Sequence, residues 1–230
     1  DQMVGPWQVP VADCAVGLVD FNGYQGDALA LGERTPVAVI NPAAASRLAV
    51  AEAVTNLSAA LIGTIDRGKL SANWMAACGP ADEDADLRDA VDAAAALCRT
   101  LGIAIPVGKD SLSMRTAWRD PQAGDERRVS APVSLVVTAF APVADARKVL
   151  TPQLAAEPGS VLILIDLGAG RQRMGGSVLA QATQQLGHEC PDLDDPQALA
   201  KFVEVIDRLG REGRLLAYRS EEHTSELQSH

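Results

Sequence analysis

Residues 48–61 read LAVAEAVTNLSAAL, and this stretch decides the fold. Nearly every residue in it is apolar, and a run of this length without proline or glycine is typical of a buried helix. Asn41 and Pro42 stand upstream, where asparagine is a good N-cap and proline suits the first helical position. Gly63 follows as a stop signal. The sequence therefore predicts a helix from Pro42 to about Leu61.

Strands and further helices are predicted on both sides of this helix, which indicates an α/β (α+β) fold. Residues 69–74 alternate polar and apolar side chains, as a half-buried strand does. Acidic residues at 82–86 begin the next helix and Gly102 ends it, while residues 119–128 form a surface hairpin loop. The other predicted elements are strands at 9–21, 103–107, 132–140, 161–165 and 215–218, and helices near 178–186 and 196–210.

The chain is expected to divide into two domains. Residues 141–158 contain three prolines, so we place a boundary there, with one domain at 1–145 and a second at 146–218. The last twelve residues, RSEEHTSELQSH at 219–230, show no apolar periodicity. They resemble the in-frame translation of a sequencing-library adapter, and we expect them to be a non-native tail.

Composition excludes several classes of function. The net charge is −10, which argues against a nucleic-acid-binding or anionic-membrane surface. Nothing resembles a transmembrane span or a signal peptide, so we expect a cytoplasmic protein. Two of the three histidines fall in the tail, which makes histidine acid–base chemistry a poor explanation. The cysteines lack C-x-x-C spacing and are expected to be small buried residues: Cys14, Cys78, Cys98 and Cys190.

An all-oxygen set is the first candidate site. Glu52 and Asn56 lie four apart on the predicted helix, which places their side chains on one face. Together with Asp13, on the first predicted strand, they offer the oxygen ligands that Mg²⁺ prefers. The alternative is structural: Asn56 makes a core hydrogen bond and Glu52 pairs with an arginine such as Arg47.

A second candidate is the strand face that carries Lys69, Ser71 and Asn73. Residues two apart in a strand project to the same side, so a lysine and two neutral polar groups could meet a phosphate. A solvated strand face would look the same. The third candidate is a predicted turn at the end of a strand, formed by Gly108, Lys109, Asp110 and Ser111. α/β proteins commonly bind ligands at such strand ends, but an ordinary surface turn would have a similar sequence.

The fourth candidate is a glycine-rich stretch at 168–177 between a predicted strand and a helix. It fits neither nucleotide motif: a dinucleotide fingerprint needs glycine where Arg173 stands, and a P-loop needs lysine where Gly176 stands. Backbone N–H groups at the start of a helix can still hold an anion. Gly175, Gly176 and Ser177 therefore remain candidate phosphate contacts.

Five stretches of the chain, taken in order, resemble the large bacterial phosphoribosylformylglycinamidine synthases. They are DQMVGPWQVPVADCAV, AVAEAVTNL, KLSANWM, PVGKDSLSM and LLAY. The resemblance implies an aminoimidazole ribonucleotide synthetase-like N-terminal domain followed by the start of the matching C-terminal domain. It implies a fragment of an ATP-dependent ligase that uses glutamine to convert formylglycinamide ribonucleotide to formylglycinamidine ribonucleotide in purine biosynthesis.

The resemblance also implies roles for individual residues. Asp13, Glu52 and Asn56 match the family's Mg²⁺ ligands, and Ala12 matches a position that contacts the nucleotide, ATP or ADP. Lys69 is assigned to the nucleotide as well. The family's fourth magnesium carboxylate follows the LLAY stretch, where this chain continues with Arg219 instead. The resemblance assigns no catalytic residue within the chain.

The implied partners are small-molecule substrates, the first synthetase half and the glutaminase domain of a longer protein. Because these parts lie outside the sequence, we expect no turnover from the chain alone. Two alternatives stay open. The segment could be a structural module that holds a nucleotide without turnover, or it could come from a related enzyme of the aminoimidazole ribonucleotide synthetase type. The KLSANWM and PVGKDSLSM stretches argue against the second.

Overall fold

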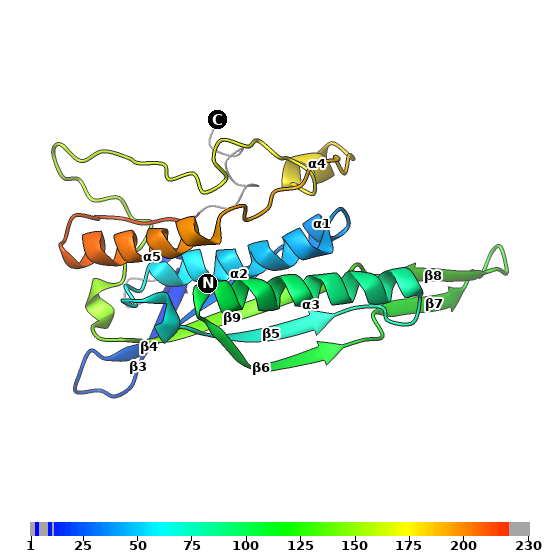
Figure 1. The fold of residues 1–230 in the computed structure, drawn as a ribbon, viewed down its shortest axis with the longest axis horizontal. Coiled ribbons are helices and arrows are strands. Elements are labelled where there is room, and N and C mark those ends of the chain that lie inside the picture. Colours follow the sequence, from blue (N-terminus) through cyan, green and yellow to red (C-terminus); the bar gives the residue numbers. More distant parts are fainter. Residues whose placement is uncertain (1–2, 5–8, 11, 221–230) are drawn as a thin grey trace.

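The computed structural model describes residues 3–4, 9–10 and 12–220. Helices stack above one face of a five-stranded sheet with the order β3-β4-β9-β5-β6, as Figure 1 shows. Residues 221–230 of the adapter-like tail lie outside the described residues. The sheet strands are β3 (Cys14–Leu18), β4 (Gly26–Glu33), β5 (Lys69–Met75), β6 (Ala104–Ser111) and β9 (Ser134–Val143). Two short pairs complete the strands: β1 (Met3–Val4) with β2 (Val9–Pro10), and β7 (Arg115–Arg119) with β8 (Glu126–Ser130).

Strand β9 is the centre of the sheet. It runs antiparallel to β4 on one side and to β5 on the other, while β5 and β6 are parallel. The described helices are α1 (Thr35–Ala38), α2 (Pro42–Ser58), α3 (Ala81–Leu101), α4 (Val178–Ala182) and α5 (Pro196–Arg211), with short 3-10 turns η1 (Ile65–Arg67) and η2 (Ala146–Lys148). The mixture of a largely antiparallel sheet with helices on one face confirms the α+β fold class.

Helix α2 begins as predicted and ends earlier. The Asn41 side chain accepts a hydrogen bond from the Ala44 N–H at 2.9 Å, which is an N-cap. The helix ends at Ser58 rather than near Leu61, because the last N–H groups bond three residues back and Leu61 adopts a positive φ of 53°. The prediction was therefore right about the helix and about one turn too long.

Strand β4 was not predicted, because its sequence GDALALGE alternates small residues with leucines and shows no polar face. Its buried positions are all glycine or alanine and face α2: Gly26, Ala28, Ala30 and Gly32. A Cβ on Gly32 would lie 2.2 Å from the Ala49 carbonyl oxygen and 2.5 Å from the Ala53 nitrogen. Gly32 thus lets the strand and helix backbones approach one another.

The predicted turn at residues 108–111 is wrong. These residues continue β6, where they pair with β5 from Ala72↔Gly108 to Met75↔Ser111. A Cβ at Gly108 would lie 2.5 Å from the Ala72 carbonyl oxygen, so glycine serves close strand packing here and not a turn. Helix α3 is confirmed, with Gly102 at φ 69° as its left-handed C-cap.

The predicted hairpin at 119–128 is confirmed by β7 and β8, which project from the body in Figure 1. Asp120 closes its turn by accepting hydrogen bonds from the N–H groups of Gln122 and Ala123. Helix α5 is confirmed too: Asp195 caps it, and it packs on α2 and α3.

Two predicted strands near the C-terminus are wrong. Residues 161–165 and 215–218 belong to no β-ladder in the described part of the chain. The predicted helix at 178–186 is confirmed only as the short α4, because Gln184 takes a positive φ of 55° and ends it. The domain division at residue 145 stays a prediction.

No helix among the described residues is long and apolar enough to cross a membrane. The core is aliphatic, with alanine, valine and leucine between α2 and the sheet. All four cysteines are free thiols, with Cys14 and Cys98 buried and Cys78 and Cys190 half-buried.

The contact between Gly32 and α2 generates a stability prediction. In Gly32→Ala the new methyl group meets helix backbone, which cannot move as a side chain can, so the free energy of unfolding should fall by about 1–3 kcal/mol. Gly17→Ala is the matched control, because a Cβ at Gly17 of β3 meets nothing within 4 Å. Urea unfolding of both variants checks this, and equal stability of the two would contradict it.

Candidate functional site

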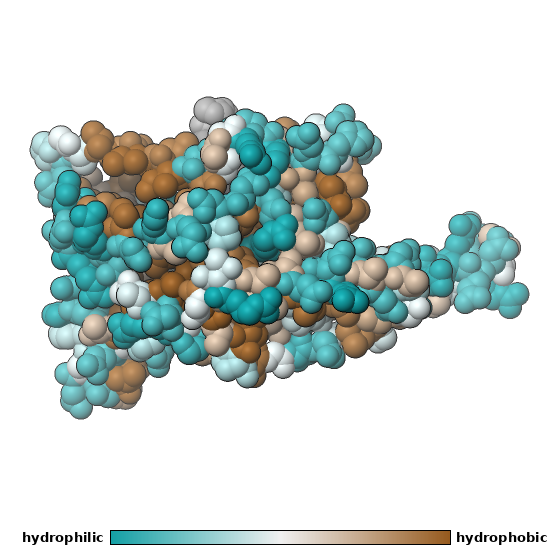
Figure 2. Space-filling model, in the orientation of Figure 1, coloured by the Kyte–Doolittle hydropathy of each residue, from teal (hydrophilic) through white to brown (hydrophobic). Residues whose placement is uncertain are grey.

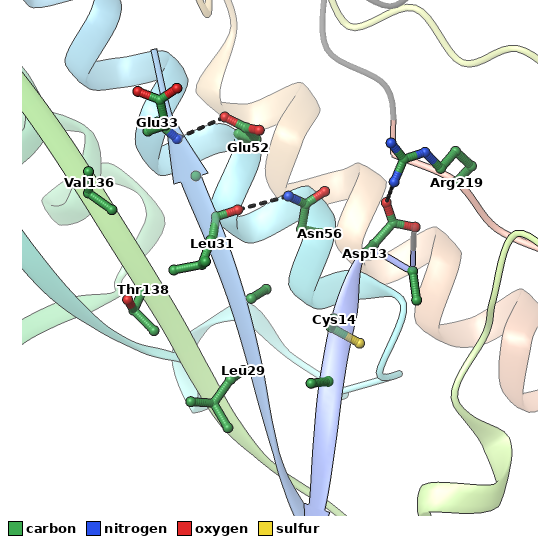
Figure 3. A pocket seen from close by; sticks show the side chains of 14 residues that line it. Asp13, Cys14, Leu29, Leu31, Glu33, Glu52, Asn56, Val136, Thr138 and Arg219 are labelled. Atoms are coloured by element: carbon green, nitrogen blue, oxygen red, sulfur yellow. Dashed lines mark hydrogen bonds and ion pairs between the residues drawn. The ribbon is translucent and has the colours of Figure 1, made fainter. Parts of the chain in front are cut away.

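A cavity of about 610 Å³ lies where β3 separates from β4. We call it the edge cavity. Its walls come from β3, β4, β9 and α2, and from the chain at Arg219. Figure 3 shows Asp13, Glu52 and Asn56 around it, so the structure brings together the three residues of the predicted magnesium site. Ala12, the predicted nucleotide contact, also lines it.

The helix side chains of the cavity bind the edge of β4. Pairing between β3 and β4 ends at Cys14↔Ala30, which leaves β4 without that partner for its last three residues. Asn56 Nδ2 donates to the Leu31 carbonyl at 2.8 Å, and the Glu33 N–H donates to Glu52 Oε2 at 2.9 Å. Glu52 and Asn56 therefore replace strand hydrogen bonds as well as lining the cavity.

Asp13 is the buried charge of the cavity. Its side chain is 0% exposed, and its Oδ1 lies 2.9 Å from the Arg219 guanidinium, whose side chain is 40% exposed. The Ser220 N–H also donates to this oxygen at 3.2 Å. Because a buried carboxylate needs a positive partner, Arg219 supplies here the charge that a bound cation would otherwise supply.

Tyr218 and Ser220 fix the chain beside α2. The Tyr218 hydroxyl donates to the Thr55 carbonyl at 2.8 Å, and the Ser220 hydroxyl donates to Thr55 Oγ1 at 2.8 Å. Burial, and then the nearby charge of Asp13, raise the pKa of Tyr218 well above its usual value. These contacts hold Arg219 at the mouth of the cavity.

The oxygen donors of the cavity are of the chemical type that hard cations prefer. Asp13 and Glu52 offer carboxylate oxygens, and the bond from Asn56 Nδ2 to Leu31 fixes the amide so that its carbonyl oxygen is the remaining ligand atom. Within the described residues there is no group of three His, Cys, Asp or Glu side chains that could hold a metal. A metal here would therefore rest on two carboxylates and one amide.

The structural alternative is supported for Asn56, and for Glu52 only the particular partner Arg47 is ruled out. Asn56 makes the expected hydrogen bond. Glu52 does not form the suggested pair with Arg47, because Arg47 binds Asp192 with Nε–Oδ1 2.7 Å and Nη2–Oδ2 2.5 Å. That bond, more than any other cause, raises the pKa of Arg47.

The predicted strand face exists, but it lies outside the edge cavity. Lys69, Ser71 and Asn73 share the face of β5 opposite the buried Leu70 and Ala72. Lys69 Nζ donates to the Asp66 and Gly68 carbonyls. Asn73 Oδ1 is buried without a hydrogen-bond partner within the described structure. Asn73 is level with Glu33 of the cavity, since both pair with Val136 of β9.

Gly108, Lys109 and Asp110 line a shallower pocket of about 290 Å³ along β6. Ser111 does not line it, and its hydroxyl accepts a hydrogen bond from Lys109 Nζ at 3.1 Å. At the glycine-rich loop, the Gly175, Gly176 and Ser177 N–H groups donate to the carbonyls of Glu189, Leu186 and Met174. The phosphate contacts assigned to both segments stay predictions, and the internal bonds of Gly175, Gly176 and Ser177 leave fewer donors for a ligand.

Sequence reasoning missed Glu33, Thr55 and Tyr218. Glu33 was missed because it lies on β4, which was not predicted. The alternation of small residues along β4 was the sequence signal that could have revealed the strand. Thr55 lies between the two predicted ligands on α2, and its contacts to Tyr218 and Ser220 join residues 163 and 165 positions apart. No local pattern reveals contacts of that range.

The described residues form an α+β domain with the edge cavity at one side of its sheet. The sequence pattern described as "FGAR-AT PurM_N-like domain" matches residues 1–142. The chain belongs to this family, that of the FGAR amidotransferases, which confirms the resemblance found in the sequence.

One similar solved structure agrees in fold, with a TM-score above 0.5. The Thermus thermophilus protein tt0281 is 14% identical over 90% of this chain and 58% of its own, with a TM-score of 0.51. Thermotoga maritima PurL complexed with ATP is 20% identical over 66% of this chain and 23% of its own, with a TM-score of 0.45. The same protein complexed with FGAR is 20% identical over 63% and 21%, with a TM-score of 0.46. The chain thus spans less than a quarter of the length of these PurL structures.

The half-buried Tyr218, whose hydroxyl is bonded to the Thr55 carbonyl, generates a pH prediction. Its pKa is raised in the folded state and is about 10 when unfolded, so its stabilising contribution is complete below pH 10 and is lost as the pH rises further. The free energy of unfolding should fall there by up to about 1.4 kcal/mol per pH unit. In Tyr218→Phe the free energy of unfolding should fall less steeply with pH.

The measurement is urea unfolding of both proteins at a series of alkaline pH values. Cys14 and Cys98, whose pKa values burial raises to about 12 and about 11, add to the loss in both proteins. The difference between the two curves therefore isolates the tyrosine, and parallel curves would show that Tyr218 does not carry it.

Proposed function

We propose that the chain is part of an ATP-dependent ligase that converts formylglycinamide ribonucleotide, glutamine and ATP to formylglycinamidine ribonucleotide. The observation that carries this is the edge cavity, where Asp13, Glu52 and Asn56 meet around a space of about 610 Å³. A cavity of this size accommodates a nucleotide, and family membership supports the substrate class. In this proposal, ADP or ATP with Mg²⁺ binds in the edge cavity.

Asp13, Glu52 and Asn56 would hold the Mg²⁺ ion. A bound Mg²⁺ supplies charge neutralisation to nucleotide phosphates. The chain's own residues prepare the site: the Leu31 carbonyl orients the Asn56 amide, and the Glu33 N–H orients the Glu52 carboxylate. Burial of the Asp13 side chain strengthens its attraction for any cation, because water does not screen it.

The complete reaction would need more than this chain. Since the chain spans 23% of Thermotoga maritima PurL, we propose that a first synthetase half and a glutaminase domain supply the rest, in the cytoplasm. Ammonia would come from the glutaminase. On this proposal the chain alone shows no synthase turnover, and it contacts neither nucleic acid nor a membrane.

A second candidate function is a structural nucleotide-holding module of the same enzyme. One observation favours it: Glu52 and Asn56 already hydrogen-bond the edge of β4, so their side chains stabilise the sheet whether or not they bind metal. Here a nucleotide would brace β3, β4 and α2 without being turned over. A substitution that removes the charge of Glu52 but keeps its hydrogen bond distinguishes a metal ligand from a residue that only stabilises the sheet.

Calorimetric titration of ADP with Mg²⁺ tests the proposed site. Asp13→Asn and Glu52→Gln should each weaken binding by about tenfold or more, because a metal ligand loses its charge. Glutamine can still accept from the Glu33 N–H, so Glu52→Gln should keep the wild-type melting temperature.

Asp27→Asn is the control, since it removes the same charge from an exposed position of β4 outside the cavity. Wild-type binding by Asp13→Asn and Glu52→Gln would refute the magnesium site. If Glu52→Gln binds normally while Glu52→Ala loses stability, the residue stabilises the sheet and does not ligate.

Arg219 generates a separate prediction. Its guanidinium and a divalent cation compete for the same carboxylate, so Arg219→Ala should raise the affinity of the chain for Mn²⁺ by about tenfold. Arg214→Ala is the matched control, because it removes the same charge from an exposed pair with Glu212. Titration followed by electron paramagnetic resonance of free Mn²⁺ measures the affinity. Equal affinities in the two variants would show that Arg219 does not compete.

A further inference from the structure

The last turn of α2 changes its hydrogen-bonding pattern. In an α-helix each carbonyl accepts from the N–H group four residues further on. At the end of α2 the Ala59 N–H donates instead to the Asn56 carbonyl, three residues back, at 3.4 Å, and the next two N–H groups also bond three residues back. This tightening takes the usual helical donor away from the Thr55 carbonyl, which therefore needs a donor from elsewhere in the chain.

Tyr218 provides that donor. Its hydroxyl donates to the Thr55 carbonyl at 2.8 Å, although 163 positions separate the two residues. Thr55 lies on α2 between Glu52 and Asn56, which both line the edge cavity. Tyr218 itself is not among the residues that line the cavity. The bond therefore fastens the turn of α2 that carries the predicted cation ligands, and it does so from outside the cavity.

Neighbouring contacts hold the Tyr218 side chain in place. The Tyr218 N–H donates to the Thr151 carbonyl at 3.0 Å, and the adjacent Leu150 N–H donates at 2.8 Å to the carbonyl of Ala59, the C-cap of α2. The centre of the Tyr218 ring lies 6.4 Å from that of Phe202 on α5. Figure 2 shows hydrophilic side chains over α5, and the helix packs on α2 and α3. The hydroxyl thus has a fixed position relative to the end of α2.

Asn56 is the ligand that depends most directly on this turn. Its carbonyl accepts the first of the three-residue bonds, and its side-chain amide donates to the Leu31 carbonyl of β4 at 2.8 Å. A return to the four-residue pattern would rotate the last turn and move the Asn56 side chain relative to β4. By satisfying the Thr55 carbonyl, the Tyr218 hydroxyl stabilises the tightened turn. Groups that orient a metal ligand in this way commonly change the metal affinity by about tenfold or more.

We propose that Tyr218 is a positioning residue of the edge cavity: its hydroxyl holds the last turn of α2 so that the Asn56 amide oxygen faces the bound cation. The inference rests on the proposed function, because it takes Mg²⁺ and a nucleotide as the ligands of the cavity. It adds that a residue far along the chain, which touches neither ligand, sets the affinity of the cavity for them.

Calorimetric titration of ADP with Mg²⁺ into the full chain tests this role. Every variant also carries Arg219→Ala, because loss of the Tyr218 bond would otherwise move the Arg219 guanidinium away from Asp13 as well. Tyr218→Phe removes the hydroxyl and keeps the ring, and it should weaken binding by about tenfold. Tyr24→Phe is the matched control and should bind as the Arg219→Ala protein does. Tyr24 is the other tyrosine of the sequence, and it is 51% exposed and outside the cavity.

A double-mutant cycle shows whether the hydroxyl acts through Asn56. Asn56→Ala removes the amide ligand, so adding Tyr218→Phe to it should weaken binding by less than about twofold further. A residue that only stabilises the fold would weaken binding by the same factor with and without Asn56, and that result would overturn the proposal. Circular dichroism checks that each variant is folded at the temperature of the titration.

Hydrogen exchange tests the same coupling with Tyr218 intact. By linkage, a contact that favours nucleotide binding is itself strengthened when the nucleotide binds. The Leu150 and Tyr218 amides of the Arg219→Ala protein should therefore exchange more slowly when ADP and Mg²⁺ are bound. Exchange rates that do not change on binding would also overturn the proposal.

The outcomes separate this inference from the proposed function. If the Arg219→Ala protein does not bind ADP with Mg²⁺, the proposed function fails and the positioning role fails with it. If that protein binds and Tyr218→Phe binds equally tightly, only the positioning role is overturned. Weaker binding in Tyr218→Phe that disappears in the Asn56→Ala background supports both.

Discussion

The close packing of β4 against α2 is the contact on which the rest of the structure depends. Only glycine and alanine occupy the buried positions of β4, and at Gly32 the strand meets the helix backbone directly. Aliphatic side chains then fill the space between α2 and the neighbouring strands. The packing is strong because it is dense, although each residue contributes little surface. Larger side chains on β4 would lift the helix and move every residue that it carries.

The edge cavity follows from this packing. Because α2 lies so close to β4, Glu52 and Asn56 reach the strand's backbone where β3 has turned away. The same two side chains line the cavity together with the buried carboxylate of Asp13. The pairing of the sheet edge and the shape of the cavity are thus two properties of one contact. A site built in this way is held in position by the core, which is how rigid binding sites are made.

Local signals in the sequence predicted most of the regular elements. Helix α2 with its Asn41 cap, α3 with its Gly102 ending and the alternating strand β5 needed only the residues within them. Prediction failed where distant residues decide the outcome: Gly108 extends β6 because Ala72 lies beside it, and residues 161–165 have the composition of a strand but find no partner. β4 escaped notice because its buried face consists of residues too small to mark a pattern.

The candidate site divides in the same way. Helical spacing placed Glu52 and Asn56 together, Asp13 joined the set from the first predicted strand, and the family resemblance assigned all three to Mg²⁺. All three residues line the edge cavity, and their binding of Mg²⁺ stays a prediction. Arg219 could not be foreseen as the partner of Asp13, since 206 positions separate them. Its approach depends on Tyr218 and Ser220, which bind Thr55 only after the C-terminal part of the chain has folded back onto α2.

The position of β9 has a consequence for the order of folding. Residues 134–143 stand between β4 and β5, both of which precede them by about sixty residues or more. During synthesis on the ribosome, the pairs β3–β4 and β5–β6 therefore cannot join into one sheet before β9 has been made. They become one sheet only when β9 has emerged, so the late central strand governs both the rate of folding and the interval in which the nascent chain is vulnerable to misassembly.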